Sequence, residues 1–95
     1  MRTYEMVVIM SPDIDAKDDK KHRQLVNKLL GSYAEGIEEF GIIGKKVLGY
    51  PIAKQNEGVY VQLKIKSDSV RISEIQKQMK LMPEIIRFML LNPEA

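Results

Sequence analysis

Apolar and polar residues alternate, or recur with helical spacing, in six successive segments of this chain. Alternation with period two marks strands, whereas apolar residues at positions i, i+3, i+4 and i+7 mark helices. Residues 2–10 carry apolar side chains on both faces, which predicts a central strand. The predicted segments are strand 2–10, helix 16–33, strand 36–54, strand 59–66, a helix that begins at Asp68 or Ser69, and strand 85–91.

The order of these segments predicts the fold class. Strand, helix, strand, strand, helix, strand is the βαββαβ plan of α+β, ferredoxin-like proteins, in which a four-stranded antiparallel sheet has two helices on one face. A chain of 95 residues has the size of one domain, so we expect a single domain over residues 1–95. The second face of the sheet is then expected to be open.

Glycine and proline positions refine the strands. Gly41 and Gly44 predict a bend or bulge, and residues 55–58, with Asn and Gly, predict a hairpin turn. Pro51 cannot donate a ladder hydrogen bond, which predicts an edge strand. Alternation in residues 44–54 predicts one inward face with Leu48, Tyr50 and Ile52, and one open face with Lys45, Val47 and Gly49.

The two helical segments have apolar stripes. Asp15, Asp18 and Asp19 stand near the start of the first helix, where acidic side chains favour the positive end of the helix dipole. The expected inner positions are His22, Leu25, Val26, Leu29, Leu30 and Tyr33 in the first helix, and Ile72, Ile75, Gln76 and Met79 in the second.

Composition limits the class of protein. The net charge is only +2, with −2 in residues 1–44 and +4 in residues 45–95, which is a weak footprint for a chain that binds nucleic acid alone. Because there is no cysteine, disulfides and thiolate chemistry are excluded and an intracellular protein is expected. The chain has no apolar run of about 18 residues and begins with a strand pattern, so we expect neither export nor a membrane.

The residues available for chemistry do not predict an enzyme. His22 is the only histidine, and its inward position favours a structural role over that of a general base. The aspartates near the first helix lack the spacing of a calcium loop, and residues 41–45 lack a phosphate-binding signature. We therefore expect no catalysis, cofactor, metal or small-molecule substrate.

The open sheet face is predicted to be more apolar than a solvated face requires. A contiguous exposed apolar patch indicates a docking surface. Leu91 belongs to this face, and Phe40, Ile42 and Ile43 extend it along the neighbouring edge. The residues expected to contact a protein partner are Val7, Ile9, Ile37, Val47, Tyr60 and Met89.

A protein with this fold can also bind RNA. An RNA-recognition motif needs several aromatic residues on its central strands, but residues 59–63 offer only Tyr60. Contact with phosphates, which positions a protein without reading sequence, is the better prediction. The residues expected to make it are Arg2, Lys45, Lys46, Lys54 and Arg87.

Residues 44–54 also resemble the signature of the bacterial small-subunit ribosomal protein six family. That signature is carried by Gly44, Lys46, Leu48, Tyr50 and Ile52 and is continued by Pro51, Ala53 and Lys54. Val47 and Gly49 depart from it, since the family usually has a polar residue and Ser or Ala there. Residues 1–5 and 85–89 resemble the family as well, so the resemblance spans nearly the whole chain.

The resemblance implies a structural protein of the cytoplasmic small ribosomal subunit. Members of the family bind small-subunit ribosomal RNA together with small-subunit protein eighteen and do no chemistry. Some carry a glutamate-rich tail that is enzymatically extended, but the sequence printed here ends at residues 92–95 without one, so that modification is not expected. An alternative is a homo-oligomeric ferredoxin-like regulator that binds a small molecule between subunits. The sequence leaves open which surface meets RNA and which meets protein.

Overall fold

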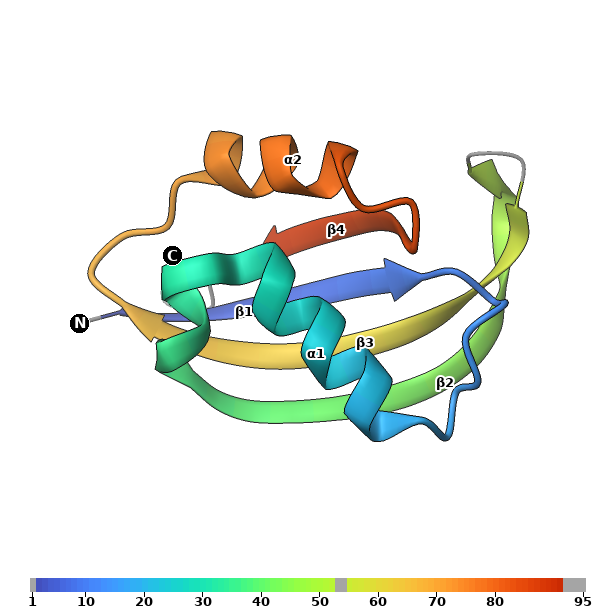
Figure 1. The fold of residues 1–95 in the computed structure, drawn as a ribbon, viewed down its shortest axis with the longest axis horizontal. Helices are drawn as coiled ribbons and strands as arrows, with labels where there is room; N and C mark the ends of the chain where they lie inside the picture. Colours follow the sequence, from blue (N-terminus) through green and yellow to red (C-terminus); the bar gives the residue numbers. More distant parts are fainter. Residues whose placement is uncertain (1, 53–54, 92–95) are drawn as a thin grey trace.

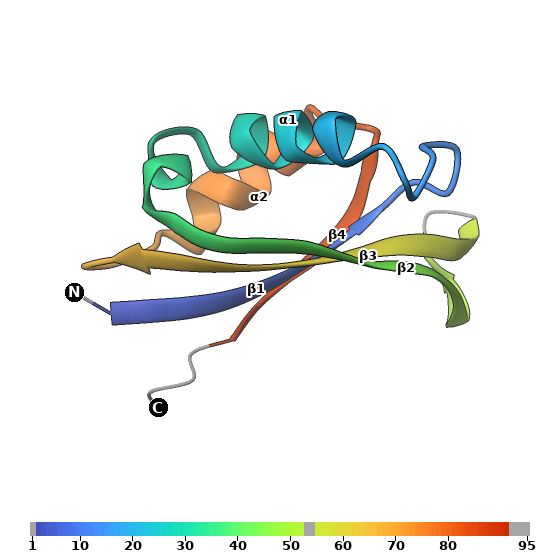
Figure 2. The ribbon, with the colours of Figure 1, turned by 90° about the horizontal axis from the view of Figure 1, so that it is seen from below.

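The computed structural model describes residues 2–52 and 55–91, with the side chains of residues 49–52 and 55 left aside. The four strands form one antiparallel sheet in the order β2-β3-β1-β4. Both helices lie on one face of this sheet, and no described element covers the other face (Figures 1 and 2). The elements are β1 (Arg2–Met10), α1 (Asp19–Leu30), the 3-10 helix η1 (Gly31–Gly36), β2 (Ile37–Ile52), β3 (Gln55–Ser67), α2 (Ile72–Lys80) and β4 (Ile85–Leu91).

This arrangement confirms the predicted ferredoxin-like α+β fold. β1 is central, because it pairs with β3 on one side and with β4 on the other. β2 and β4 are the edge strands, so the position predicted from Pro51 is confirmed. The core lies between the helices and the sheet and consists of Met6, Val8, Met10, Leu25, Val26, Leu29, Leu30, Val59, Val61, Leu63, Ile65, Ile75, Met82 and Ile85.

Helix α1 is shorter than the predicted span 16–33. It begins at Asp19 because the Asp18 side chain caps it, accepting a hydrogen bond from the backbone N–H of Lys21 at 3.0 Å. It ends before Gly31, which has φ +57° and therefore turns the chain out of the helix into η1. The residues of α1 expected to face inward are buried, His22 among them.

Helix α2 begins at Ile72, so the predicted caps Asp68 and Ser69 are wrong. The N-cap is Arg71, whose backbone N–H donates to the Tyr33 hydroxyl of η1 at 3.0 Å. At the start of α2, a backbone N–H group is therefore satisfied by a hydroxyl from η1, whereas a cap from a nearby side chain, Asp68 or Ser69, was expected.

The predicted inner face of α2 is correct only in part. Ile75 is buried and Met79 packs against the core, but Ile72 is 46% exposed and Gln76 is exposed. Ile72 and Gln76 face a hollow beside β4 and not the sheet. Met82, which follows the helix, completes the buried side.

The predicted hairpin turn at residues 55–58 is also displaced. Ile52 pairs with Gln55, so these residues belong to β3 and the connection between the strands lies outside the described residues. Gly58 is a strand residue without positive φ. It is required for space: a methyl group there would overlap Ile9 Cγ2 and lie 3.4 Å from the backbone oxygen of Met10.

Strand β2 contains one extra residue beside Gly44. Ile42 pairs with Val61 and Gly44 pairs with Tyr60, so Ile43 has no partner of its own. Gly44 has φ +130°, a conformation that other residues rarely adopt. The bulge predicted from the glycines is confirmed at Gly44.

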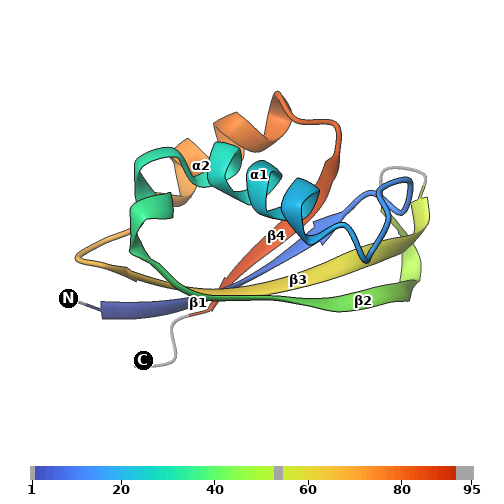
Figure 3. The ribbon, with the colours of Figure 1, turned by 60° about the horizontal axis from the view of Figure 1, so that its bottom comes forward.

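The bulge reverses the faces of the residues that follow it. Lys45 pairs with Val59, whose side chain lies in the core, so Lys45 and Val47 lie on the helix side of the sheet. The predicted open-face position of both is wrong, and Lys46 takes the open side instead. Leu48 is buried, as predicted. The hairpin end of β2 and β3 extends past the helices (Figure 3), which is why Val47 is 76% exposed there.

We expect Gly58→Ala to lower the free energy of unfolding by about 1–3 kcal/mol, the usual cost of overpacking. The added methyl group must displace Ile9, a branched side chain held between neighbouring strands. The matched control is Gly41→Ala on β2, where an added Cβ meets nothing within 4 Å. Urea unfolding curves compare the two variants, and an equal effect of both would contradict the packing role of Gly58.

Candidate functional site

The uncovered side of the sheet, here called the open face, is ordered in rows that cross all four strands. Strand register fixes these rows, because directly paired residues point to the same side. From β2 to β4 the rows are Glu39, Lys64, Glu5 and Leu91; then Gly41, Gln62, Val7 and Met89; then Gly44, Tyr60, Ile9 and Arg87.

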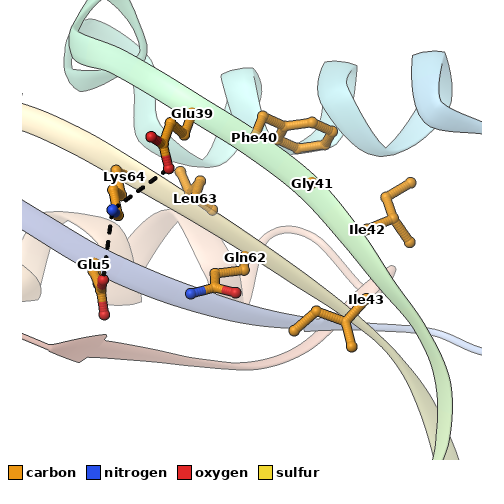
Figure 4. A pocket seen from close by; sticks show the side chains of 9 residues that line it. All are labelled: Glu5, Glu39, Phe40, Gly41, Ile42, Ile43, Gln62, Leu63 and Lys64. Carbon is orange, nitrogen blue, oxygen red and sulfur yellow. Dashed lines mark ion pairs between the residues drawn. The ribbon is translucent and has the colours of Figure 1, made fainter.

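The first row is ionic. Lys64 Nζ lies 3.5 Å from a Glu39 carboxylate oxygen and 4.0 Å from a Glu5 carboxylate oxygen (Figure 4). All three side chains are partly exposed, so each pair contributes only about 0–1 kcal/mol to stability. The network fixes the charge of this end of the face: two carboxylates surround one ammonium group.

The second row contains a hollow of about 350 Å³ over Gly41. Gly41 pairs regularly with Gln62 and does not form part of the bulge. The hollow is lined by Glu5, Glu39, Phe40, Gly41, Ile42, Ile43, Gln62, Leu63 and Lys64 (Figure 4).

The β1 and β4 side of the open face is apolar and partly exposed. Val7 is half-buried, Met89 is 37% exposed and Leu91 is 50% exposed. Tyr60, also half-buried, lies in the next row. Of the predicted partner residues, Val7, Tyr60 and Met89 therefore share one accessible surface, as expected of a docking site.

The other predicted partner residues do not join this surface. Ile9 is only 3% exposed, because it fills the space over Gly58 next to Ile86. Ile37 pairs with the buried Ile65 and packs against the helix-side core. Val47 is exposed but lies on the opposite side of the sheet, beyond the bulge.

Of the edge residues expected to extend the patch, only Ile43 is free to do so. Phe40 and Ile42 pack against the core, and the Arg23 guanidinium of α1 lies 5.1 Å from the centre of the Phe40 ring. Ile43 is 49% exposed, since the bulge leaves it without a cross-strand partner.

The predicted basic residues divide into separate groups. Lys46 lies on the open face with its Nζ 6.0 Å from the centre of the Tyr60 ring. Arg87 lies in the same row as Tyr60 at the β4 margin, three strand spacings or about 14 Å from β2.

Two further basic residues lie apart, and one is outside the described residues. Lys45 is exposed next to Lys46, but on the helix side. Arg2 lies eight positions before Met10 on β1, about 27 Å toward the far end of the sheet. Lys54 lies outside the described residues, so the structure does not place it.

The acidic and histidine side chains near α1 have structural roles. The Asp15 side chain accepts a hydrogen bond from the backbone N–H of Lys17 at 2.9 Å. His22 is 0% exposed, and its Nε2 donates to the backbone oxygen of Asp15 at 3.0 Å. Among residues 2–52 and 55–91, no group of three or more His, Asp or Glu side chains is placed to hold a metal ion.

Two features of the open face were not predicted from the sequence. One is the ionic row, although alternation of strands 2–10 and 59–66 already places Glu5 and Lys64 on the same face. The other is the hollow over Gly41, since the glycine was interpreted only as a possible bulge.

Taken together, the fold and the open face define a binding module: a ferredoxin-like sandwich whose bare sheet surface carries an apolar strip between an ionic end and a basic end. The family model described as ribosomal protein S6 matches residues 3–92. The chain belongs to the ribosomal protein S6 family, which confirms the resemblance.

Curated relatives support this assignment over nearly the whole chain. Small ribosomal subunit protein bS6 of Prochlorococcus marinus strain MIT 9515 is 38% identical over 92 residues, and that of strain MIT 9312 is 37% identical. These matches cover 97% of this chain but only 59% and 60% of the relatives, so the chain spans about three fifths of their length. The bS6 protein of Synechococcus sp. strain CC9311 is 33% identical, with 76% of its length covered.

A solved structure has the same fold. The crystal structure of 30S ribosomal protein S6 from Thermotoga maritima superposes with a TM-score of 0.78 at 26% sequence identity. The match covers 98% of this chain and 88% of that one. In the part of this chain that the structure describes, no helix has the length and apolar character needed to cross a membrane.

We expect Ile9→Ala to lower the free energy of unfolding by about 2–4 kcal/mol, because it removes buried methyl groups and leaves a cavity. Val47→Ala serves as the control, since 76% of Val47 is exposed and its truncation should change stability by less than about 0.5 kcal/mol. Chemical denaturation measures both. Ile9→Ala that is as stable as the unmodified chain would show that Ile9 is a free surface residue after all.

Proposed function

We propose that this chain is a structural component of the small ribosomal subunit, where it binds small-subunit ribosomal RNA together with small-subunit protein eighteen. Membership of the S6 family and relatives named as small ribosomal subunit proteins support this role. As part of that particle, the chain functions in the cytoplasm and has no small-molecule substrate.

The observation that carries the proposal is the bare open face. One side of the sheet is sealed by two helices, while the other leaves Val7, Met89 and Leu91 accessible to a partner. An accessible apolar strip on a sheet is stabilised when another chain covers it. Protein eighteen is proposed to lie on this strip.

The charge of the chain supports binding of RNA as one half of a pair. A net charge of +2 supplies little of the electrostatic attraction that RNA binding needs. A second protein can contribute its own basic residues and hold this chain in place by apolar contact. This chain then does not need a large positive charge of its own to bind RNA.

Phosphate contacts are proposed for the hairpin end of β2. Lys45 and Lys46 are adjacent and exposed on opposite sides of the strand, so a backbone that passes the strand edge can reach both. Arg87 at the β4 margin extends this end of the face, whereas Arg2 can reach RNA only at the far end of the sheet.

A homo-oligomeric regulator with a ligand between its subunits gains no support from any particular contact among the described residues. It remains distinguishable by experiment, because it predicts a discrete oligomer in sedimentation. The ribosomal role predicts association with protein eighteen instead.

The purified chain is expected to bind a small-subunit ribosomal RNA fragment weakly and to gain affinity when protein eighteen is added. The gain arises because the pair offers RNA a larger basic surface than this chain alone. Fluorescence anisotropy at one fixed salt concentration measures both titrations. Equal affinity with and without protein eighteen would rule out binding as a pair.

Replacing Lys45 and Lys46 together by alanine should weaken RNA binding by the pair about tenfold at physiological salt and reduce the salt slope by about 1.5, the share of two phosphate contacts. Lys20→Ala with Lys21→Ala is the matched control, because it removes the same charge from the exposed side of α1. The same titration is repeated at several salt concentrations. If the helix variant weakens binding as much as the strand variant, the phosphate contacts do not lie on β2.

A further inference from the structure

The hollow over Gly41 lies on the open face, so it belongs to the surface proposed to contact the partner protein. Its wall toward the bulge is the exposed Ile43, and its opposite wall is the ionic row of Glu39, Lys64 and Glu5 (Figure 4). A volume of about 350 Å³ is enough for one long side chain.

The backbone does not require glycine at this position. Gly41 has no positive φ, pairs regularly with Gln62, and would accept a Cβ that meets nothing within 4 Å. Glycine within a strand costs stability relative to other residues. The consequence of Gly41 is therefore open space on the binding face, in contrast to Gly58, whose missing side chain is replaced by Ile9.

The lining of the hollow is chemically unequal. Ile43 offers apolar surface, whereas Glu39 and Glu5 offer two carboxylates that share one ammonium group, Lys64. Among the described residues of this row, two carboxylates and one ammonium group carry a net charge of −1, and 69% of the Glu39 side chain is exposed. Such a site suits a side chain with an aliphatic stem and a cationic head.

We propose that the hollow over Gly41 receives an arginine or lysine side chain of the protein partner, with its stem against Ile43 and its head at Glu39 and Glu5. This inference rests on the proposed association with protein eighteen. RNA is the poorer occupant, because its phosphates would meet two carboxylates at close range. The open face is thereby divided: RNA contact belongs to the basic end, and protein contact to the apolar strip and the ionic end.

Three variants test this assignment. Gly41→Leu places a side chain in the hollow, starting from a Cβ that meets nothing within 4 Å, and Glu39→Gln removes one of the two carboxylate charges beside Lys64. Glu38→Gln is the matched control, since Glu38 is the neighbouring residue, also pairs with a lysine, Lys66 at 3.8 Å, and does not line the hollow. Isothermal titration with purified protein eighteen measures affinity, and unfolding curves check that each variant folds.

Gly41→Leu and Glu39→Gln are expected to weaken binding of protein eighteen about fivefold or more, as for loss of an interfacial charge contact, and Glu38→Gln less than about twofold. Of the two test variants, only Glu39→Gln should also make the affinity for protein eighteen less dependent on salt, because it removes a charge. If Gly41→Leu fails to fold, Glu39→Gln against Glu38→Gln decides the question.

The contrary outcomes are distinct. Unchanged binding of protein eighteen by both test variants overturns the inference and leaves the proposed function standing. Absence of binding by the unmodified chain overturns both. Weaker RNA binding by Gly41→Leu alone, without protein eighteen, would show that RNA occupies the hollow and would also overturn the inference.

Discussion

The pairing of β1 between β3 and β4 is the constraint on which the rest of the structure depends. It places Met6, Val8 and Met10 under the helices and thereby assigns Val7 and Ile9 to the other side of the sheet. A shift of one residue would exchange the two sets, so the apolar core and the open face are fixed by the same hydrogen bonds.

The bulge beside Gly44 adds a local change to that regular frame. One unpaired residue, Ile43, moves Lys46 to the side of Tyr60 and Lys45 to the side of the helices. Without it, the two lysines would have exchanged sides, and Lys45 instead of Lys46 would lie beside Tyr60. The bulge, with Gly44 at positive φ, therefore decides which lysine the open face presents, not whether it presents one.

Much of the architecture could be predicted from the sequence because each element has a clear period. The central position of residues 2–10, the edge position of the strand with Pro51 and the single-sided helices all follow from local patterns. Helix ends were less predictable, since the N–H of Arg71 is satisfied by Tyr33, which lies far away in the sequence. The hairpin turn was misplaced because Gly58 looks like a turn glycine but is required for packing against Ile9.

The composition of the open face was predictable, but the exact position of each side chain was not. Val7, Tyr60 and Met89 were assigned correctly to the open face because alternation alone decides their side. Ile9 was not recognised as buried, since its cover comes from a glycine and from Ile86 on two other strands. Val47 and Lys45 were misassigned because a bulge cannot be located to one residue by alternation.

The sheet also brings together strands that are far apart in the sequence. Val7 and Met89 are 82 residues apart in the sequence, yet the two are direct neighbours on the open face. During translation, β1 is synthesised before β4, with which it pairs. The apolar strip therefore forms only after β4 has been synthesised. This strip is a product of the assembled sheet and is not present in any single segment of the chain.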